Sequence, residues 1–127
     1  MSVEAHVDGS VLNNGMYNAQ AGYGVYWTGG NLTNIARRVE GQQTVSRAEA
    51  EAVRAAVNQA NSAGYRSVVI YTDSEENLRG LDGRHTVNLD IWNQINQLKN
   101  QGMRVQGVKI ARGQNSANGL AQQGARK

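Results

Sequence analysis

The stretch SVVIYTDS at residues 67–74 is a short apolar run that ends in a carboxylate. Gly64 precedes the run and polar residues follow it, a pattern typical of a strand covered on both faces in the middle of an α/β sheet. Asp73 then lies at the carboxyl end of that strand, where open α/β sheets place their ligands. The question for the rest of the sequence is which other side chains reach the same edge.

The chain has 127 residues, enough for one domain that buries roughly two-thirds of the surface exposed by its unfolded form. We therefore expect a single domain over residues 1–127, acting as a monomer. The sequence contains neither an apolar run of about 18 residues nor a signal-peptide pattern, which predicts no membrane association and an intracellular location, cytoplasmic or nuclear. Zero cysteines exclude disulfides and thiolate metal sites.

The net charge is +3, and the cations are concentrated toward the end of the sequence. No Asp or Glu follows Asp90, whereas six basic residues do: Lys99, Arg104, Lys109, Arg112, Arg126 and Lys127. This pattern is compatible with a solvated basic face and with a surface for a polyanion such as nucleic acid. Charge by itself favours the solvated face.

The sequence before residue 40 predicts three strands in an antiparallel meander. Residues 3–8 alternate between apolar and polar side chains, so Asp8 is the last member of the polar face, and we expect Gly9 to end the strand. Turn residues at 13–15 lead to a β-rich run at 22–27, in which Tyr26 and Trp27 point to opposite faces. A third strand is predicted around residues 32–39, with an Arg37-Arg38 pair that suggests an exposed edge.

The clearest helix is predicted from Ser46 to Ala63. Ser46 and Glu49 fit a capping box, and Gly64 follows in the position where glycine commonly ends helices. Positions 49, 52, 53, 56, 57 and 60 form a stripe at helical spacing that is apolar except for its first member. Glu49 is therefore expected to face the sheet, and the strand after this crossover helix is expected to pair in parallel.

The remaining sequence predicts a short helix at 74–81, a longer helix at 88–101, a strand at 105–110 and a last helix at 116–125. Tyr71 and Trp92 fall on apolar faces, so we expect both in the core. His6 is interpreted as a structural strand residue and His85 as a loop residue.

Three acidic side chains, Asp8, Glu49 and Asp73, are expected to meet at one edge of the sheet. Carboxylates this close repel one another unless a cation lies between them. Oxygen ligands without a nearby Cys or His favour Mg²⁺, with Mn²⁺ as a substitute, over zinc. Taken singly, each acid also has a structural interpretation, as a turn residue, half of a capping box or a helix cap; their shared location favours a metal site.

Three short motifs resemble those of the catalytic domain of type 1 ribonuclease H. They are VDGS at 7–10, QTVSRAE at 43–49 and YTDS at 71–74, and AGYGVYW at 21–27 is similar to the second strand of that family. The resemblance implies an α/β fold with a five-stranded mixed sheet, made of a three-stranded antiparallel meander and two parallel strands, with helices on both faces. It also implies endonucleolytic cleavage of the RNA strand of an RNA/DNA hybrid.

The resemblance further implies a mechanism with two Mg²⁺ ions, one activating water and the other stabilising the leaving oxygen. Asp8 would bridge both ions, and Glu49 and Asp73 would bind the ion at the leaving group. Contacts to the 2′-hydroxyls and the shallow minor groove of the hybrid are implied for the positions matching Asn14, Gly15, Gln43 and Thr44.

The sequence departs from the family pattern at its fourth catalytic acid. The family motif Ala-Asp-x-Leu-Ala is matched by residues 117–121, in which Asn118 takes the place of the aspartate. An amide oxygen can still bind Mg²⁺, but one negative charge is missing on the side of the water-activating ion. We therefore expect weaker metal binding there and reduced or metal-dependent activity.

Two further departures concern the substrate. The loop around residues 110–113 looks shortened and lacks the histidine that the family often carries, and the basic helix that some members insert is absent. Substrate contacts would then have to come from elsewhere, with Arg112, Lys109 and the Arg37-Arg38 pair as candidates and Arg112 foremost. Taken singly, each of these residues is more readily interpreted as a solvated surface residue. The alternative is a catalytically impaired domain that binds hybrids or proteins, but three mutually repelling acids favour an enzyme.

Overall fold

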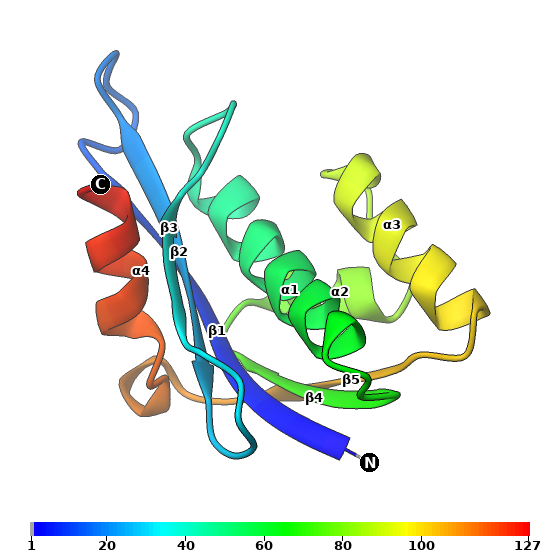
Figure 1. Cartoon of the computed structure of the whole chain (residues 1–127). Helices are drawn as coiled ribbons and strands as arrows, with labels where there is room; N and C mark the ends of the chain where they lie inside the picture. The colour runs from blue at the N-terminus through cyan, green and yellow to red at the C-terminus, as the bar shows by residue number, and fades with distance from the viewer. Residues whose placement is uncertain (1) are drawn as a thin grey trace.

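Five strands form one mixed sheet in the order β3-β2-β1-β4-β5 in the computed structural model, which describes residues 2–127 (Figure 1). The strands are β1 (Ser2–Leu12), β2 (Gln20–Trp27), β3 (Ile35–Arg38), β4 (Ser67–Thr72) and β5 (Arg104–Lys109). β2 pairs antiparallel with β1 and β3, whereas β4 pairs in parallel with β1 and β5. The predicted meander with two added parallel strands is therefore confirmed.

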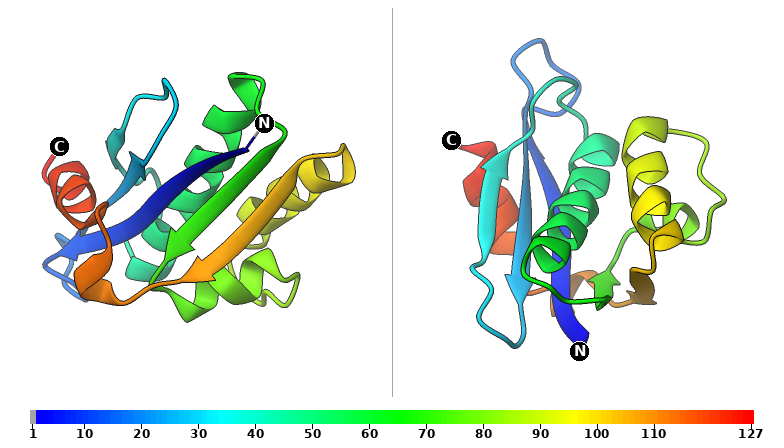
Figure 2. Two further views of the ribbon diagram at one scale, coloured as in Figure 1. Left: turned by 90° about the horizontal axis from the view of Figure 1, so that it is seen from below. Right: turned by 45° about the vertical axis from the view of Figure 1, so that its right-hand side comes forward.

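Helices cover both faces of the sheet, as predicted (Figure 2). The helices are α1 (Val45–Ser62), α2 (Glu75–Leu81), α3 (Leu89–Asn100) and α4 (Asn118–Ala125), and a short 3₁₀ helix, η1 (Arg112–Gln114), precedes α4. α1, α2 and α3 lie on one side of the sheet and α4 lies on the other. Among the helices of residues 2–127, none has the length and apolar character needed to cross a membrane.

The core lies between α1 and the sheet. The predicted helical stripe is buried throughout, with Ala52, Val53, Ala56, Val57 and Ala60 packed in the core and Glu49 buried at its start. These small and β-branched side chains let α1 lie close to β1 and β4. The prediction that Glu49 faces the sheet is confirmed.

The aromatic residues follow the predicted alternation along β2. Trp27 is 7% exposed and belongs to the core, whereas Tyr26 is 38% exposed. Trp92 of α3 is buried, as expected from its place on the apolar face. The prediction that Tyr71 lies in the core is wrong. Its ring is only half-buried, and its hydroxyl donates to Glu4 Oε1 at 3.2 Å.

The reason for this correction is the coverage of β4. Val68, Ile70 and Thr72 are buried under the helices, but Val69 and the ring of Tyr71 on the other face are only partly covered. α4 packs mainly on β1, β2 and β3, leaving that face of β4 open. The expectation that this strand is covered on both faces is therefore wrong.

β1 continues past the predicted end at Gly9. Its ladder with β2 runs from Ala5 opposite Trp27 to Leu12 opposite Gln20, so Gly9 and the residues after it are strand residues. The parallel ladder with β4 stops earlier, with His6 opposite Tyr71 as its last pair. Asp8 consequently lies just beyond the end of the β4 ladder, beside the chain segment that carries Asp73.

The start of α1 also differs from the prediction. Thr44 is the N-cap, because its backbone is extended and its hydroxyl accepts a hydrogen bond from the Arg47 amide at 3.2 Å. Ser46 lies inside the helix and donates to Glu76 Oε1 at 2.5 Å, so no capping box forms with Glu49. The other predicted boundaries move by one to three residues, and the strand expected at 32–39 is shortened to β3.

Candidate metal centre

Three elements bring Asp8, Glu49 and Asp73 together. Asp8 comes from β1, Glu49 from the first turn of α1, and Asp73 directly follows β4. One carboxylate oxygen from each lies within 4.8 Å of the others. The predicted convergence of these three acids is present in the structure.

Gly9 makes this convergence possible. A Cβ at this position would lie 2.7 Å from both Ala48 Cβ and the Glu49 amide nitrogen, so only glycine allows α1 to approach β1 so closely. The Gly9 amide donates to Asp8 Oδ1 at 2.9 Å and also to Glu49 Oε1. A single backbone amide thus orients two of the three carboxylates.

Asn77 fixes the relative positions of α1, α2 and β4. Its buried side-chain amide donates to the Glu49 carbonyl oxygen at 3.1 Å and to Thr72 Oγ1 at 3.2 Å. Ser74 caps α2 by accepting from the Asn77 amide at 3.1 Å. The two segments that carry Glu49 and Asp73 are therefore joined through one residue.

The carboxyl groups are in an environment that disfavours their charge. Burial, the hydrogen bond and charge of Asp8, and the charge of Asp73 together raise the pKa of Glu49 to about 9. Burial also raises the pKa of Asp8, with a further increase from the charge of Asp73 and a decrease from Arg112. These groups need a positive charge among them to be ionised together.

The residues present fit a divalent cation. Asp73 Oδ2 is buried and has no hydrogen-bond partner among residues 2–127. Such an orphaned carboxylate oxygen, next to two further carboxylates, forms the all-oxygen donor set that Mg²⁺ and Mn²⁺ prefer. Asp8, Glu49 and Asp73 could together bind such an ion.

Asn118 is the first residue of α4 and is exposed. It lines the same cleft as the three acids, together with Arg112 and Gln122. The structure thus places Asn118 and Arg112 in the cleft that contains the acids. Gln122 was not predicted, although its spacing of four residues from Asn118 places both on one face of a helix.

The predicted substrate contacts fall into two groups. Asn14 and Gly15 are exposed in the hairpin loop between β1 and β2. The amide of Gln43, by contrast, makes four hydrogen bonds within the chain: its oxygen accepts from the Ala21 amide and Arg38, and its nitrogen donates to two backbone carbonyl oxygens. Thr44 is the N-cap of α1.

Several polar side chains have structural partners instead of a place in the cleft. His6 accepts from the Ser116 amide at 3.0 Å, and the ring of His85 lies 6.5 Å from that of Trp92. Lys109 pairs with Glu75 at 2.5 Å. The structural interpretation of His6 is supported by this contact, and Lys109 is already paired.

The profile of the family described as RNase H matches residues 1–127. The chain belongs to the RNase H family. Ribonuclease H1 of Rattus norvegicus is 32% identical to it over 99% of this chain, and human ribonuclease H1 is 30% identical over 98%. The chain spans about half the length of these relatives, 51% of the rat protein and 50% of the human one.

Solved structures show the same fold as this RNase H domain. The N-terminal RNase H domain of a Mycobacterium tuberculosis protein superposes with a TM-score of 0.81 at 24% identity, covering 98% of this chain and 94% of that one. LC11-RNase H1, solved in complex with an RNA/DNA hybrid, gives 0.80 at 23% identity and covers 98% and 96%. The predicted family and fold are therefore confirmed.

Proposed function

We propose that this RNase H domain cleaves the RNA strand of RNA/DNA hybrids endonucleolytically in the presence of Mg²⁺ or Mn²⁺. The observation that carries the proposal is the group of three carboxylates within 4.8 Å of one another. It lies in a cleft that also contains Arg112 and Asn118. The hybrid in the LC11-RNase H1 structure supports this choice of substrate.

Asp8, Glu49 and Asp73 would bind the ions, and Asn118, which lines the same cleft, would contribute an amide oxygen. Bound divalent ions stabilise developing charge on phosphoryl and leaving oxygens and lower the pKa of bound water; two ions can act together in this way. Arg112 lies close enough to lower the pKa of Asp8. Its guanidinium would contact a phosphate in the cleft, because it matches phosphate geometry.

Asn118 would reduce activity without abolishing it. The amide stands where the family motif has a charged aspartate, while the three acids that line the same cleft remain. Substituting Asn118→Asp should restore that charge. At the effective dielectric of a partly exposed site, one charge a few ångströms away contributes on the order of 1–4 kcal/mol, which corresponds to roughly tenfold or more in rate.

The test is a cleavage assay on a hybrid with labelled RNA, in Mg²⁺ and in Mn²⁺. We expect slow cleavage by the parent chain, at least about tenfold faster cleavage by Asn118→Asp, and none by Asp73→Asn. Undiminished cleavage by Asp73→Asn would show that the proposed site is wrong. Hybrid binding without cleavage by the parent, in either metal, would favour the catalytically impaired binding module instead.

A further inference from the structure

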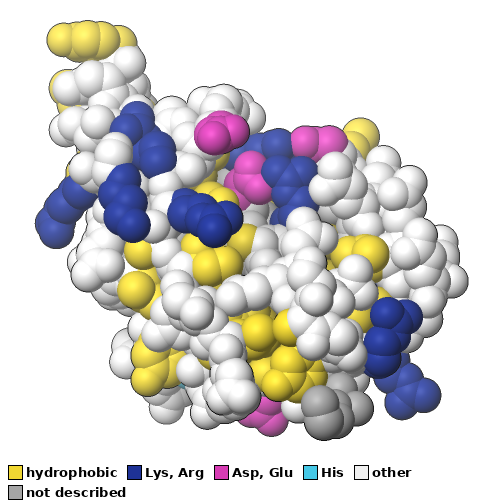
Figure 3. Space-filling view, viewed as in Figure 1, with side chains coloured by type: hydrophobic (Ala, Val, Ile, Leu, Met, Phe, Trp, Pro, Cys, Tyr) yellow, Lys and Arg dark blue, Asp and Glu magenta, His cyan; other side chains and the backbone are white. Residues whose placement is uncertain are grey.

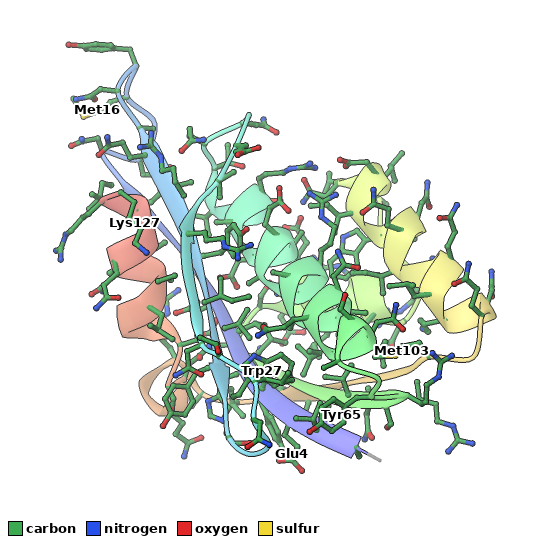
Figure 4. All side chains as sticks on the ribbon, in the orientation of Figure 1. Glu4, Met16, Trp27, Tyr65, Met103 and Lys127 are labelled. Atoms are coloured by element: carbon green, nitrogen blue, oxygen red, sulfur yellow. The ribbon has the colours of Figure 1, made fainter. Side chains whose placement is uncertain are left out.

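The loop between β1 and β2 projects beyond the rest of the molecule (Figures 1 and 4). Two large apolar side chains lie on it: Met16 is 58% exposed and Tyr17 is 100% exposed. The remaining residues of the loop are small or polar. Tyr17 therefore contributes no buried surface to the fold, and packing does not explain an aromatic ring at this position.

The loop has a defined conformation in the structure. Asn13 and Gly15 have positive φ angles of 55° and 81°. The Met16 amide donates to the Asn13 carbonyl at 3.0 Å, and the Ala19 amide donates to the Met16 carbonyl at 3.1 Å. Two consecutive turns thus present Met16 and Tyr17 at the tip of a paired hairpin, which reduces the entropy lost when these side chains bind something.

The catalytic cleft leads toward this hairpin. Asp8, Gly9, Ser10 and Val11 are successive residues of β1, and all of them line the cleft. The strand rise of about 3.3 Å per residue places Asn13, at the start of the loop, about 16 Å from Asp8. At about 3.4 Å per nucleotide step, this distance corresponds to about five nucleotides, and Tyr17 at the tip lies farther from the acids.

The base of the hairpin is basic. α4 ends beside it, because a Cβ on Gly22 of β2 would lie 1.9 Å from the Ala125 amide nitrogen, and Arg126 and Lys127 follow directly. Arg38 donates to the Lys127 carbonyl at 3.4 Å. Figure 3 shows Lys and Arg side chains gathered close to the projecting tip, with hydrophobic atoms on the tip itself.

We propose that Tyr17, with Met16 beside it, packs against the sugars and base edges in the minor groove of the nucleic-acid substrate, at least about five nucleotides from the site of cleavage. Cationic side chains beside an exposed aromatic ring are the combination by which proteins contact phosphates and bases together. The wide, shallow minor groove of an A-like duplex is open to such a ring. The inference rests on the proposed function and assigns Tyr17 as a positioning residue for the substrate.

The test compares Tyr17→Ala, Tyr17→Phe and the matched hairpin control Asn18→Ala. Binding is measured on a hybrid of about 12 base pairs in the Asp73→Asn background, so that the hybrid stays intact. We expect Tyr17→Ala to weaken binding at least about fivefold, because the variant loses one aromatic contact with the substrate. Tyr17→Phe and Asn18→Ala should bind like the parent, and thermal unfolding should be the same for all three because the side chains are exposed.

A length series separates direct contact from an indirect effect. The hybrid is shortened one base pair at a time from each end in turn, with the cleavage position kept constant. The penalty of Tyr17→Ala should disappear once one side is shorter than about five base pairs. In cleavage assays with the active chain, Tyr17→Ala should raise KM and leave kcat unchanged, because Tyr17 lies far from the acids.

Each of the following results would overturn the inference. In the first, Tyr17→Ala binds the long hybrid as tightly as the parent does. If the parent also cleaves the hybrid, the proposed function stands and only the role of Tyr17 is wrong. Asn18→Ala could cause an equal loss, in which case the ring has no specific role. The substitution could abolish binding of a protein partner and leave hybrid binding unchanged, which would assign the tip to a protein interface. If the parent neither binds nor cleaves hybrids, the proposed function fails first and this inference with it.

Discussion

At the residue scale, Glu49 has two conflicting requirements. The residue is 6% exposed and its carboxyl lies beside Asp8 and Asp73, so burial and neighbouring charge favour the protonated form. A carboxylate that binds a cation must be ionised, so binding of the proposed ion would release a proton from this group. The free energy of unfolding should accordingly depend on both pH and divalent metal.

The first prediction concerns protein kept free of divalent metal by a chelator. The pKa of Glu49 rises on folding from 4.5 to about 9, so the folded state retains a proton that the unfolded state releases. The stabilisation is complete below the unfolded value and is lost as pH rises through the folded value. Thermal unfolding should show a Tm that falls from about pH 5 to about pH 9.

Glu49→Gln and added Mg²⁺ provide the controls for this prediction. The substitution should flatten the dependence of Tm on pH, because the titrating group is gone. Mg²⁺ should raise the Tm of the parent most at high pH, since an ion that binds only the folded state stabilises it. A parent profile that is flat in chelator would contradict the assigned environment of Glu49.

At the element scale, the position of α4 depends on glycine. A Cβ on Gly24 of β2 would lie 2.6 Å from Leu120 Cβ, and one on Gly124 would lie 2.3 Å from the Arg37 carbonyl oxygen. Helix and sheet backbones are therefore in direct contact, with no side chain between them. This contact is what brings Asn118, at the start of α4, into the same cleft as Asp8.

Two glycines of α4 give a matched pair of substitutions. Gly124→Ala should destabilise the protein by about 1–3 kcal/mol, because neither the helix nor the β3 backbone can move without losing contacts. Gly119→Ala, whose Cβ would meet nothing within 4 Å, should stabilise it by up to about 1 kcal/mol through helix propensity. Urea unfolding measures both; equal effects would show that α4 does not pack as described.

At the scale of the whole molecule, the cations near the end of the sequence separate into different surfaces. Lys109 pairs with Glu75, and Lys99 donates to the Leu81 carbonyl at 3.0 Å. Arg112 lines the cleft, whereas Arg104 begins β5 and pairs with the start of β4, at the opposite end of the strands from Asp73. Only part of the basic sequence is thus placed to meet a polyanion at the site.

This separation predicts different salt dependences of hybrid binding. Each phosphate contact contributes about 0.9 to the slope of log K against log salt concentration. Arg112→Ala should therefore lower the magnitude of the slope by about 0.9, and Arg104→Ala should leave it unchanged. Titrations at several salt concentrations measure both variants; an equal decrease in the two would mean that the cleft is not where the substrate binds.

The order and type of the main elements follow from the sequence alone, because periodicity is a local property. The stripe from Glu49 to Ala60 and the apolar run ending at Asp73 indicated a helix crossing between parallel strands. The motifs around Asp8, Glu49 and Asp73 also indicated the family and the three acids. Each of these features depends on neighbours along the chain.

Features that depend on contacts between distant segments became apparent only in the folded structure. Pairing with β2 extends β1 beyond Gly9, where the sequence predicts its end. The uncovered face of β4 leaves Tyr71 half-exposed, although the apolar run around it predicts a core position. The amide of Gln43 is engaged by Ala21 and Arg38, and Tyr17 projects at the end of a hairpin that follows the cleft. Periodicity cannot reveal such features, because they result from which backbone groups and surfaces meet once the sheet has formed.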